Sequence, residues 1–340
     1  MNRKHFLSFL ITAGATTMVS KAASVESAFP VKPFRIPPYL KEGDTIGITS
    51  PASFIGLEEI GPAVQLIQSW GFNTQIGKTI GKRDFILGGT DIERIEDFQL
   101  MLDNPNVKAI MCARGGYGIV RIIDQLDFKQ FKKHPKWIIG FSDITLLHNH
   151  IYANFGIASV HSKMCNSFPK VWQEALPMQI ETILSIKQVI SGQPVRYTAP
   201  YNSNNRIGRA EGVLIGGNLS LIETAAGTSS DIITDGKILF LEDTEEQLYS
   251  LDRMLWNLKR SGKFDKLKGL IIGGFKLKPD PEGDEFGKTL QDIILEKIKE
   301  YDYPVCFDFP VGHQINNFAL KCGAPHILNI DQNGSSLTSI

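Results

Sequence analysis

Ser142 stands where a short apolar run changes into a helical pattern. The run covers 137–140, and the apolar side chains of 144–152 recur at helical spacing. A strand-to-helix corner turns its side chain out of the sheet edge, and the N–H groups that open the helix stabilise a developing negative charge, so Ser142 is a candidate nucleophile. The second glycine of the familiar Gly-x-Ser-x-Gly elbow is absent. The alternative is an N-cap, in which Ser142 or Asp143 only accepts hydrogen bonds from the helix.

A nucleophilic serine needs a base, and the base needs an orienting carboxylate. Among the histidines, His313 directly follows a strand-like run and stands on a glycine-containing turn, which suits a cleft; the alternative is a loop histidine bonded to backbone. Glu242 and Asp243 end another strand-like run. Helix capping by Asp243 or Thr244 explains those two residues but not Glu242. Spacing alone does not show that these groups meet.

The elements that must position these residues alternate between strand and helix. The predicted strands of the first half are 44–49, 73–76, 107–112, 137–140 and 157–160, and the predicted helices are 57–70, 91–102, 119–126 and 144–152. This alternation indicates βαβ units and a parallel sheet covered on both faces. Ligands bind such sheets at the carboxyl ends of the strands, which is where Ser142, His161 and the loop 114–118 are expected.

A chain of 340 residues predicts two domains. We expect an α/β protein with an N-terminal parallel-sheet domain, flavodoxin- or Rossmann-like, over 39–165. A helix and a linker rich in Pro, Asn, Ser and Gly follow over 166–207. A smaller C-terminal α/β domain over 208–335 then carries Glu242 and His313.

The composition excludes several classes of partner. Lysine plus arginine and aspartate plus glutamate both number 36, so the net charge is zero and offers no footprint for nucleic acid or an anionic membrane. The four cysteines have no metal-ligand spacing, and no other cluster of metal ligands is visible, so we expect no metal site. One disulfide or four buried free thiols are both compatible with the pattern.

The N-terminus has the composition of an export signal. Arg3, Lys4 and His5 precede an apolar run over 6–18, and small residues follow at Ser20 and Ala22. We expect residues 1–22 to be a cleaved signal peptide and the protein to be periplasmic or otherwise exported. An uncleaved anchor is the alternative, and the sequence does not distinguish Sec from twin-arginine export.

Six ordered segments resemble the LD-carboxypeptidase family of serine peptidases, whose branches include muramoyltetrapeptide carboxypeptidases and microcin C immunity peptidases. They are Gly-Asp-Thr-Ile-Gly-Ile at 43–48, Arg-Gly-Gly-Tyr-Gly at 114–118, Ile-Gly-Phe-Ser-Asp-Ile-Thr at 139–145, Gly-Gly-Asn-Leu at 216–219, Phe-Leu-Glu-Asp at 240–243, and Gly-His at 312–313. The resemblance spans 39–330. It departs from the family pattern at 161–163, where His-Ser-Lys replaces the common His-Gly-Pro, and at 320–323, where Leu-Lys-Cys-Gly replaces Leu-Pro-x-Gly.

The resemblance implies a role for each matching residue. Ser142 would be the nucleophile, His313 the general base and then acid, and Glu242 the carboxylate that orients it. The oxyanion hole would use the N–H of Asp143 and one from Gly115 or Gly116. The resemblance also offers three residues for substrate binding: Arg114, Tyr117 and Asn218. A structural salt bridge is the alternative role for Arg114.

The implied reaction is cleavage between an L-centre and a C-terminal D-residue, which releases D-Ala from peptidoglycan-derived tetrapeptides without a metal or cofactor. Two alternatives stay open: a microcin-immunity-type peptidase that cleaves a peptide–nucleotide amide, and a non-catalytic periplasmic protein that binds muropeptides. The expected partner is thus a muropeptide or other short peptide, not nucleic acid. The mature chain is expected to have no integral membrane span, and a homodimer is a family expectation.

Overall fold

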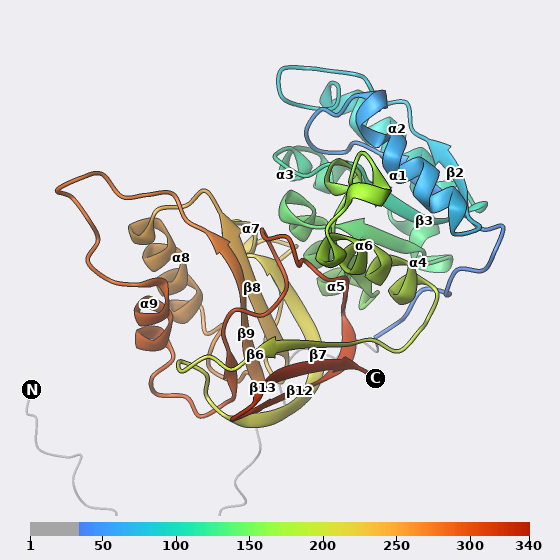
Figure 1. Ribbon diagram of the computed structural model, residues 1–340. Coiled ribbons are helices and arrows are strands. Elements are labelled where there is room, and N and C mark those ends of the chain that lie inside the picture. The colour runs from blue at the N-terminus through green and yellow to red at the C-terminus, as the bar shows by residue number, and fades with distance from the viewer. Residues whose placement is uncertain (1–33) are drawn as a thin grey trace, which may run out of the picture. The chain divides into compact units, whose positions relative to one another are not determined.

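The computed structural model describes residues 34–340, which fold around two β-sheets joined by a shared core (Figure 1). The expected signal peptide, 1–22, lies outside the described residues. The first sheet has the strand order β11-β5-β4-β3-β1-β2. Its strands are β1 (Thr45–Thr49), β2 (Asn73–Ile76), β3 (Val107–Cys112), β4 (Trp137–Gly140), β5 (Ser159–His161) and β11 (Leu320–Cys322).

Helices cover both faces of this sheet. The helices of this half are α1 (Leu57–Ser69), α2 (Asp91–Asp103), α3 (Ile119–Ile122), α4 (Lys129–Lys133), α5 (Thr145–Phe155) and α6 (Pro177–Ile190). Successive strand residues point to opposite faces: Met111 joins the core under α1 and α6, whereas Ile110 joins the core under α2 and α5. Strands β5, β4, β3, β1 and β2 run parallel, as expected, because crossover helices connect them. The carboxyl ends of these strands therefore lie along one edge.

The second sheet has seven strands in the order β10-β9-β8-β7-β12-β13-β6. They are β6 (Arg196–Pro200), β7 (Gly208–Asn218), β8 (Ile238–Thr244), β9 (Gly269–Lys276), β10 (Val305–Cys306), β12 (Ala324–Asp331) and β13 (Gly334–Ser339). Strands β7 to β10 are parallel, and β12, β13 and β6 add an antiparallel edge. Three helices accompany them: α7 (Leu219–Ala225), α8 (Leu248–Arg260) and α9 (Leu290–Lys297). The prediction of an α/β protein with two sheets is confirmed.

The segment expected to be a linker contains a strand. Residues 196–200 form β6, which pairs with β13, and its alternate residues Tyr197 and Ala199 are buried. The abundance of Pro, Asn, Ser and Gly in 191–206 concealed this alternation. Strand β11 was also missed, and it is the C-terminal segment that closes the first sheet by pairing antiparallel with β5. Three residues are too few to carry a periodicity.

The cysteine pattern left open a disulfide or free thiols, and the structure decides for free thiols. All four cysteines are free and buried. Among residues 34–340, no helix is both long enough and apolar enough to cross a membrane.

The buried thiols are expected to be unreactive in the folded protein. Burial raises the pKa of Cys165, Cys306 and Cys322 to about 12 and raises that of Cys112 further, so the nucleophilic thiolate is scarce at pH 8. Iodoacetamide should add nothing to the native protein at pH 8 and four groups after unfolding in urea, as counted by intact mass. Rapid addition to the native protein would contradict the burial of the thiol concerned.

Candidate active site

Ser142 lies at a strained corner between β4 and α5. Its φ is +61°, in the left-handed region that costs a non-glycine residue free energy. A 3₁₀ turn over Ser142–Ile144 carries the chain into α5, with the Ile144 N–H donating to the Phe141 carbonyl at 3.2 Å. The side chain of neither Ser142 nor Asp143 caps this helix. The strain therefore serves the orientation of Ser142 rather than an N-cap.

Asp143 binds a different element. Its Oδ2 accepts a hydrogen bond from the Ile119 N–H at 2.9 Å, which ties the corner to the start of α3. The carboxylate is almost wholly buried, and this burial raises its pKa to about 6 even though the Ile119 N–H and the charge of Arg94 oppose the shift. The side chain of Asp143 thus holds the corner in place, and its backbone N–H remains next to Ser142.

His313 and Glu242 form a hydrogen-bonded pair. Nδ1 of His313 lies 2.5 Å from Oε2 of Glu242, and the Glu242 side chain is fully buried at the carboxyl end of β8. An ionised carboxylate only accepts, so Nδ1–H donates and Nε2 is left with a free lone pair. This is the tautomer and orientation that a general base requires.

The pair exists because the backbone comes very close to Glu242 at Gly312. Gly312 has φ of +101°, and a Cβ placed there would lie 2.4 Å from the Cβ of Glu242. The Gly312 N–H donates to Oδ1 of Asn317 at 2.9 Å, and Gly312 pairs with Gly274 of β9 in an isolated bridge. Glycine is therefore required next to His313 for two reasons, backbone conformation and space.

Contacts between the segments of the first sheet and those of the second bring the Ser142 corner to the His313–Glu242 pair. The ring of Phe141, the residue before Ser142, lies 5.0 Å from the ring of His313, measured between centroids. The N–H of Asn218 donates to Oγ1 of Thr145 at 3.1 Å. Among the described residues no hydrogen bond joins Ser142 to His313, which is common for catalytic groups before substrate binds.

The glycine loop after β3 lies against Ser142. A Cβ on Gly115 would lie 3.1 Å from the Cβ of Ser142, and Gly116 adopts φ of +94°. Within residues 34–340 the N–H groups of Gly115 and Gly116 have no hydrogen-bond acceptor, whereas the Tyr117 N–H donates to Oγ of Ser53. Unpaired N–H groups next to a serine are the donors that an oxyanion hole needs.

The other predicted substrate-binding residues are engaged in different ways. The Arg114 guanidinium donates to the Phe54 carbonyl at 3.1 Å and has no carboxylate partner among the described residues. The Tyr117 side chain is exposed. Asn218 is buried, caps α7 through the Leu221 N–H, and donates to Asp243. The Asn218 side chain is thus largely committed to the fold.

Sequence reasoning did not identify Arg94 as important to the site. It is fully buried on α2, pairs with Asp91, and donates to the carbonyls of Pro51 at 2.6 Å and Gly118 at 3.0 Å. These bonds fasten the ends of two loops at the carboxyl edge of the sheet. The only signal was a charged residue on the apolar face of the predicted helix.

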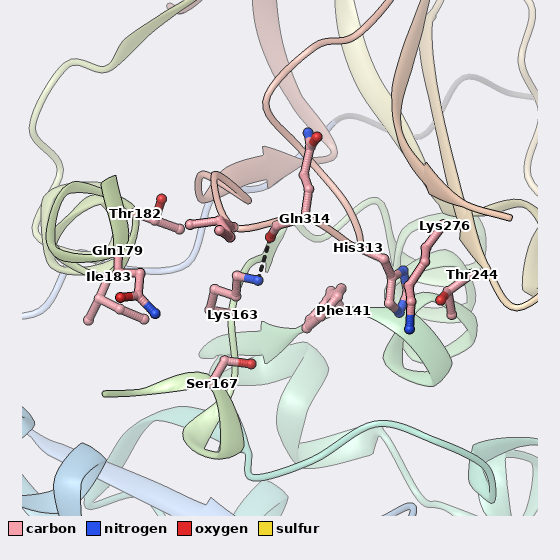
Figure 2. Close-up of a pocket in the computed structure, with 11 residues that line it drawn as sticks. Phe141, Lys163, Ser167, Gln179, Thr182, Ile183, Thr244, Lys276, His313 and Gln314 are labelled. Carbon is pink, nitrogen blue, oxygen red and sulfur yellow. Dashed lines mark hydrogen bonds between the residues drawn. The ribbon is translucent and has the colours of Figure 1, made fainter. Parts of the chain in front are cut away.

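A cavity of about 440 Å³ opens beside this constellation (Figure 2). It is lined by Phe141, Lys163, Ser167, Gln179, Thr182, Ile183, Thr244, Lys276, His313, Gln314 and Ile315. None of these side chains is a carboxylate. In the described part of the chain, no group of three or more His, Cys, Asp or Glu residues could hold a metal ion. His161, which the sequence places at the same sheet edge as Ser142, is fully buried between Phe141 and Phe240, and burial lowers its pKa.

Comparisons with known proteins agree with this architecture. Residues 46–162 match the family model of the LD-carboxypeptidase N-terminal domain, and 211–328 match that of the C-terminal domain. A probable murein peptide carboxypeptidase of Bacillus subtilis is 34% identical over 86% of this chain and 91% of its own. The crystal structure of muramoyltetrapeptide carboxypeptidase from Oxalobacter formigenes is 26% identical, with a TM-score of 0.75 over 87% of this chain and 98% of that one. The Microcin C7 self-immunity protein MccF of Escherichia coli is 28% identical over 88% of this chain and 94% of its own.

Replacing Gly312 by Ala is expected to destabilise the protein more than the same change at Gly283. Both glycines have positive φ, so both variants carry a backbone cost of about 1–2 kcal/mol. Only Gly312→Ala also forces a methyl group against Glu242, which adds about 1–3 kcal/mol of overpacking, because nothing lies within 4 Å of a Cβ on Gly283. Urea denaturation measures both. Equal losses would show that Gly312 is needed for its conformation alone.

Asp143→Asn is expected to change how stability depends on pH. The pKa of Asp143 is about 6 in the folded protein and near its ordinary 3.8 when unfolded, so between these values the folded state holds more protons. The unfolding free energy of the wild type therefore falls as pH rises from 4 to 6, by at most about 3 kcal/mol relative to the variant. Urea denaturation at pH 4 and pH 7 tests this. The exposed Asp127, changed to Asn, is the control and should show no such fall; a pH-independent difference at position 143 would refute the assignment.

Proposed function

This chain belongs to the LD-carboxypeptidase family and is a hydrolase, and from that premise we propose that it is a serine carboxypeptidase that releases the C-terminal D-Ala of peptidoglycan-derived tetrapeptides. The observation that carries the proposal is the His313–Glu242 pair, whose imidazole contacts the residue before the strained Ser142. A pure binding protein gains nothing from a strained serine beside an oriented histidine. The alternative of a non-catalytic muropeptide-binding protein is set aside, because both family models are those of peptidases.

The proposed reaction starts with His313 acting as a base. Its Nε2 takes the hydroxyl proton of Ser142 while Oγ attacks the carbonyl carbon of the residue before D-Ala. The buried Glu242 carboxylate stabilises the resulting imidazolium through Nδ1–H. Negative charge develops on the former carbonyl oxygen, which would accept hydrogen bonds from the Asp143 N–H and from Gly115 or Gly116.

Collapse of this intermediate breaks the C–N bond. His313 gives its proton to the leaving amine, D-Ala departs, and an ester joins the peptide to Ser142. A water molecule then attacks the ester with His313 again as the base, and Ser142 regains its proton as the shortened peptide leaves. These steps require a nucleophile, a base, an orienting carboxylate and oxyanion donors. Residues of this kind are all present in the described part of the chain, which supports a reaction without a metal or cofactor.

A second candidate is cleavage of a peptide–nucleotide amide, favoured by the similarity to the Microcin C7 self-immunity protein. A nucleobase is commonly held by stacking on an aromatic side chain. Apart from His313, Phe141 is the one aromatic residue lining the described cavity, and its ring already contacts His313. We therefore rank this second function below tetrapeptide cleavage.

We further propose that residues 1–22 direct export, so that the enzyme works on wall fragments in the periplasm or cell envelope. The support is the basic start and apolar run of that segment. Cell fractionation tests it, and full-length protein confined to the cytoplasm would refute it.

We also propose that the protein forms a homodimer, as the family resemblance implies. Sedimentation velocity measures the oligomeric state.

In the decisive experiment the purified protein is incubated with disaccharide-tetrapeptide and, separately, with disaccharide-pentapeptide. The release of D-Ala is followed by mass spectrometry. We expect release from the tetrapeptide only. Ser142→Ala should abolish it, and Glu242→Gln or His313→Asn should lower kcat by about 10²–10⁴-fold, because the base is lost or misoriented. Circular dichroism confirms that the variants fold. Undiminished release by Ser142→Ala would refute the mechanism, and cleavage of a peptidyl nucleotide but not the tetrapeptide would establish the second candidate.

A further inference from the structure

Lys163 lines the cavity between the Ser142 corner and α6. It lies two residues after β5, and Figure 2 shows its side chain next to Phe141 and below Gln314. Its Nζ donates to the Gln314 carbonyl at 2.6 Å and lies 5.8 Å from the centre of the Phe141 ring. Phe141 precedes the proposed nucleophile and Gln314 follows the proposed base. Lys163 is therefore close to the reacting groups without belonging to the triad.

The Lys163 ammonium has no counter-ion among residues 34–340. An ammonium has three N–H donors, and the described residues supply a single hydrogen-bond acceptor and no carboxylate within salt-bridge distance. Burial lowers the pKa of Lys163, and the nearby charge of Glu242 opposes this shift, but Glu242 itself is bound to His313. A partly buried cation that is incompletely paired costs free energy, and a carboxylate arriving from solvent would recover part of it.

The rest of the cavity has the same preference for negative charge. Its polar lining consists of hydroxyl, amide, imidazole and ammonium groups, with no carboxylate. Its second lysine, Lys276, differs from Lys163 because it is mostly exposed and forms a salt bridge of 2.7 Å with Glu245. A cavity whose walls carry only neutral and basic groups attracts anionic ligands. Lys163 is the lining cation that remains available to bind one.

We propose that the Lys163 ammonium binds a carboxylate of the substrate and makes this cavity selective for acidic peptides. The inference rests on the proposed function and deepens it by naming a specificity-determining contact. Two carboxylates of a wall tetrapeptide have the required chemistry: the C-terminal carboxylate of D-Ala, and the side-chain carboxylate of a diaminopimelate residue at position three. A lysine at position three lacks the second one.

The competing role for Lys163 is a purely structural one. The bond to the Gln314 carbonyl ties the segment after β5 to the loop that carries His313, so loss of the lysine could misplace the base. A misplaced base slows the cleavage of every substrate. A lost carboxylate contact weakens only those substrates that carry the carboxylate. Pairs of acid and amide substrates separate the two roles.

The test measures kcat and KM of the full chain on matched tetrapeptides. One pair has diaminopimelate at position three with its side-chain carboxyl free or amidated, and the other has a C-terminal D-Ala carboxylate or amide. For the acid that Lys163 recognises, Lys163→Met should raise KM at least 10-fold. KM for the matching amide should stay nearly unchanged. Lys163→Arg should restore most of the affinity. Lys170→Met removes the same charge from an exposed position of the same segment, outside the cavity lining, and should change neither constant.

The substrate pair in which Lys163→Met raises KM for the acid but not for the amide identifies the carboxylate that is bound. If Lys163→Met lowers kcat equally for acids and amides, or changes nothing, the inference is overturned while the proposed function stands. If the wild type cleaves no tetrapeptide, the proposed function fails, and the inference is then tested by calorimetry with the Ser142→Ala protein. The inference is supported if the Ser142→Ala protein binds the acid more tightly than the amide and if this difference disappears when Lys163→Met is added. Equal binding of acid and amide, or no binding, would overturn the inference.

Discussion

The hydrogen bond from His313 to Glu242 is the interaction on which the geometry of the site depends, and it is set by close approach of backbone rather than by the two side chains alone. Glu242 is fully buried and lies near the carboxyl end of β8, a strand in the interior of the second sheet. The His313 loop reaches it only because Gly312 has no Cβ and adopts a positive φ. A buried polar group without a partner would be costly, and the bond from His313 satisfies Oε2 of Glu242. Oε1 of Glu242 has no partner among the described residues, which makes the single bond from His313 more important.

Close approach of backbone at a glycine also brings the two sheets together. Gly217, at the end of β7, has φ of +134°, and a Cβ there would lie 2.5 Å from Oγ1 of Thr145 at the start of α5. This approach allows the bond between the Asn218 N–H and Thr145, which lies three residues after Ser142. A shared apolar core extends under both sheets, from Trp137 to Phe240. The strain at Ser142 persists because the buried strand before it and the helix after it are both held by this packing.

Charge is distributed unevenly around the site. Acidic groups behind it, Asp143 and Asp243, are buried, and burial raises the pKa of each to about 6. Both accept backbone hydrogen bonds and hold loops in place rather than facing the cavity. The cavity itself presents basic and neutral groups. These two carboxylates thus hold the framework, whereas the space for substrate is left favourable to an anion.

The sequence by itself determined the class of the fold, the order of most of its elements and the identity of the residues that the structure gathers. Ser142 follows β4 of the first sheet and Glu242 lies near the carboxyl end of β8 of the second, and the carboxyl ends of the parallel strands within each sheet share an edge whatever the details of packing. Strand β6 was hidden by its polar composition and β11 by its shortness, because pairing with a distant strand rather than local pattern creates both. Only the tertiary structure decided that His313 meets Glu242, that Asn218 is committed to the fold, and that Lys163 faces the cavity with no counter-ion in the described part of the chain. Those facts depend on contacts between residues that are 71, 25 and 151 positions apart in the chain, respectively, and local sequence patterns do not specify such contacts.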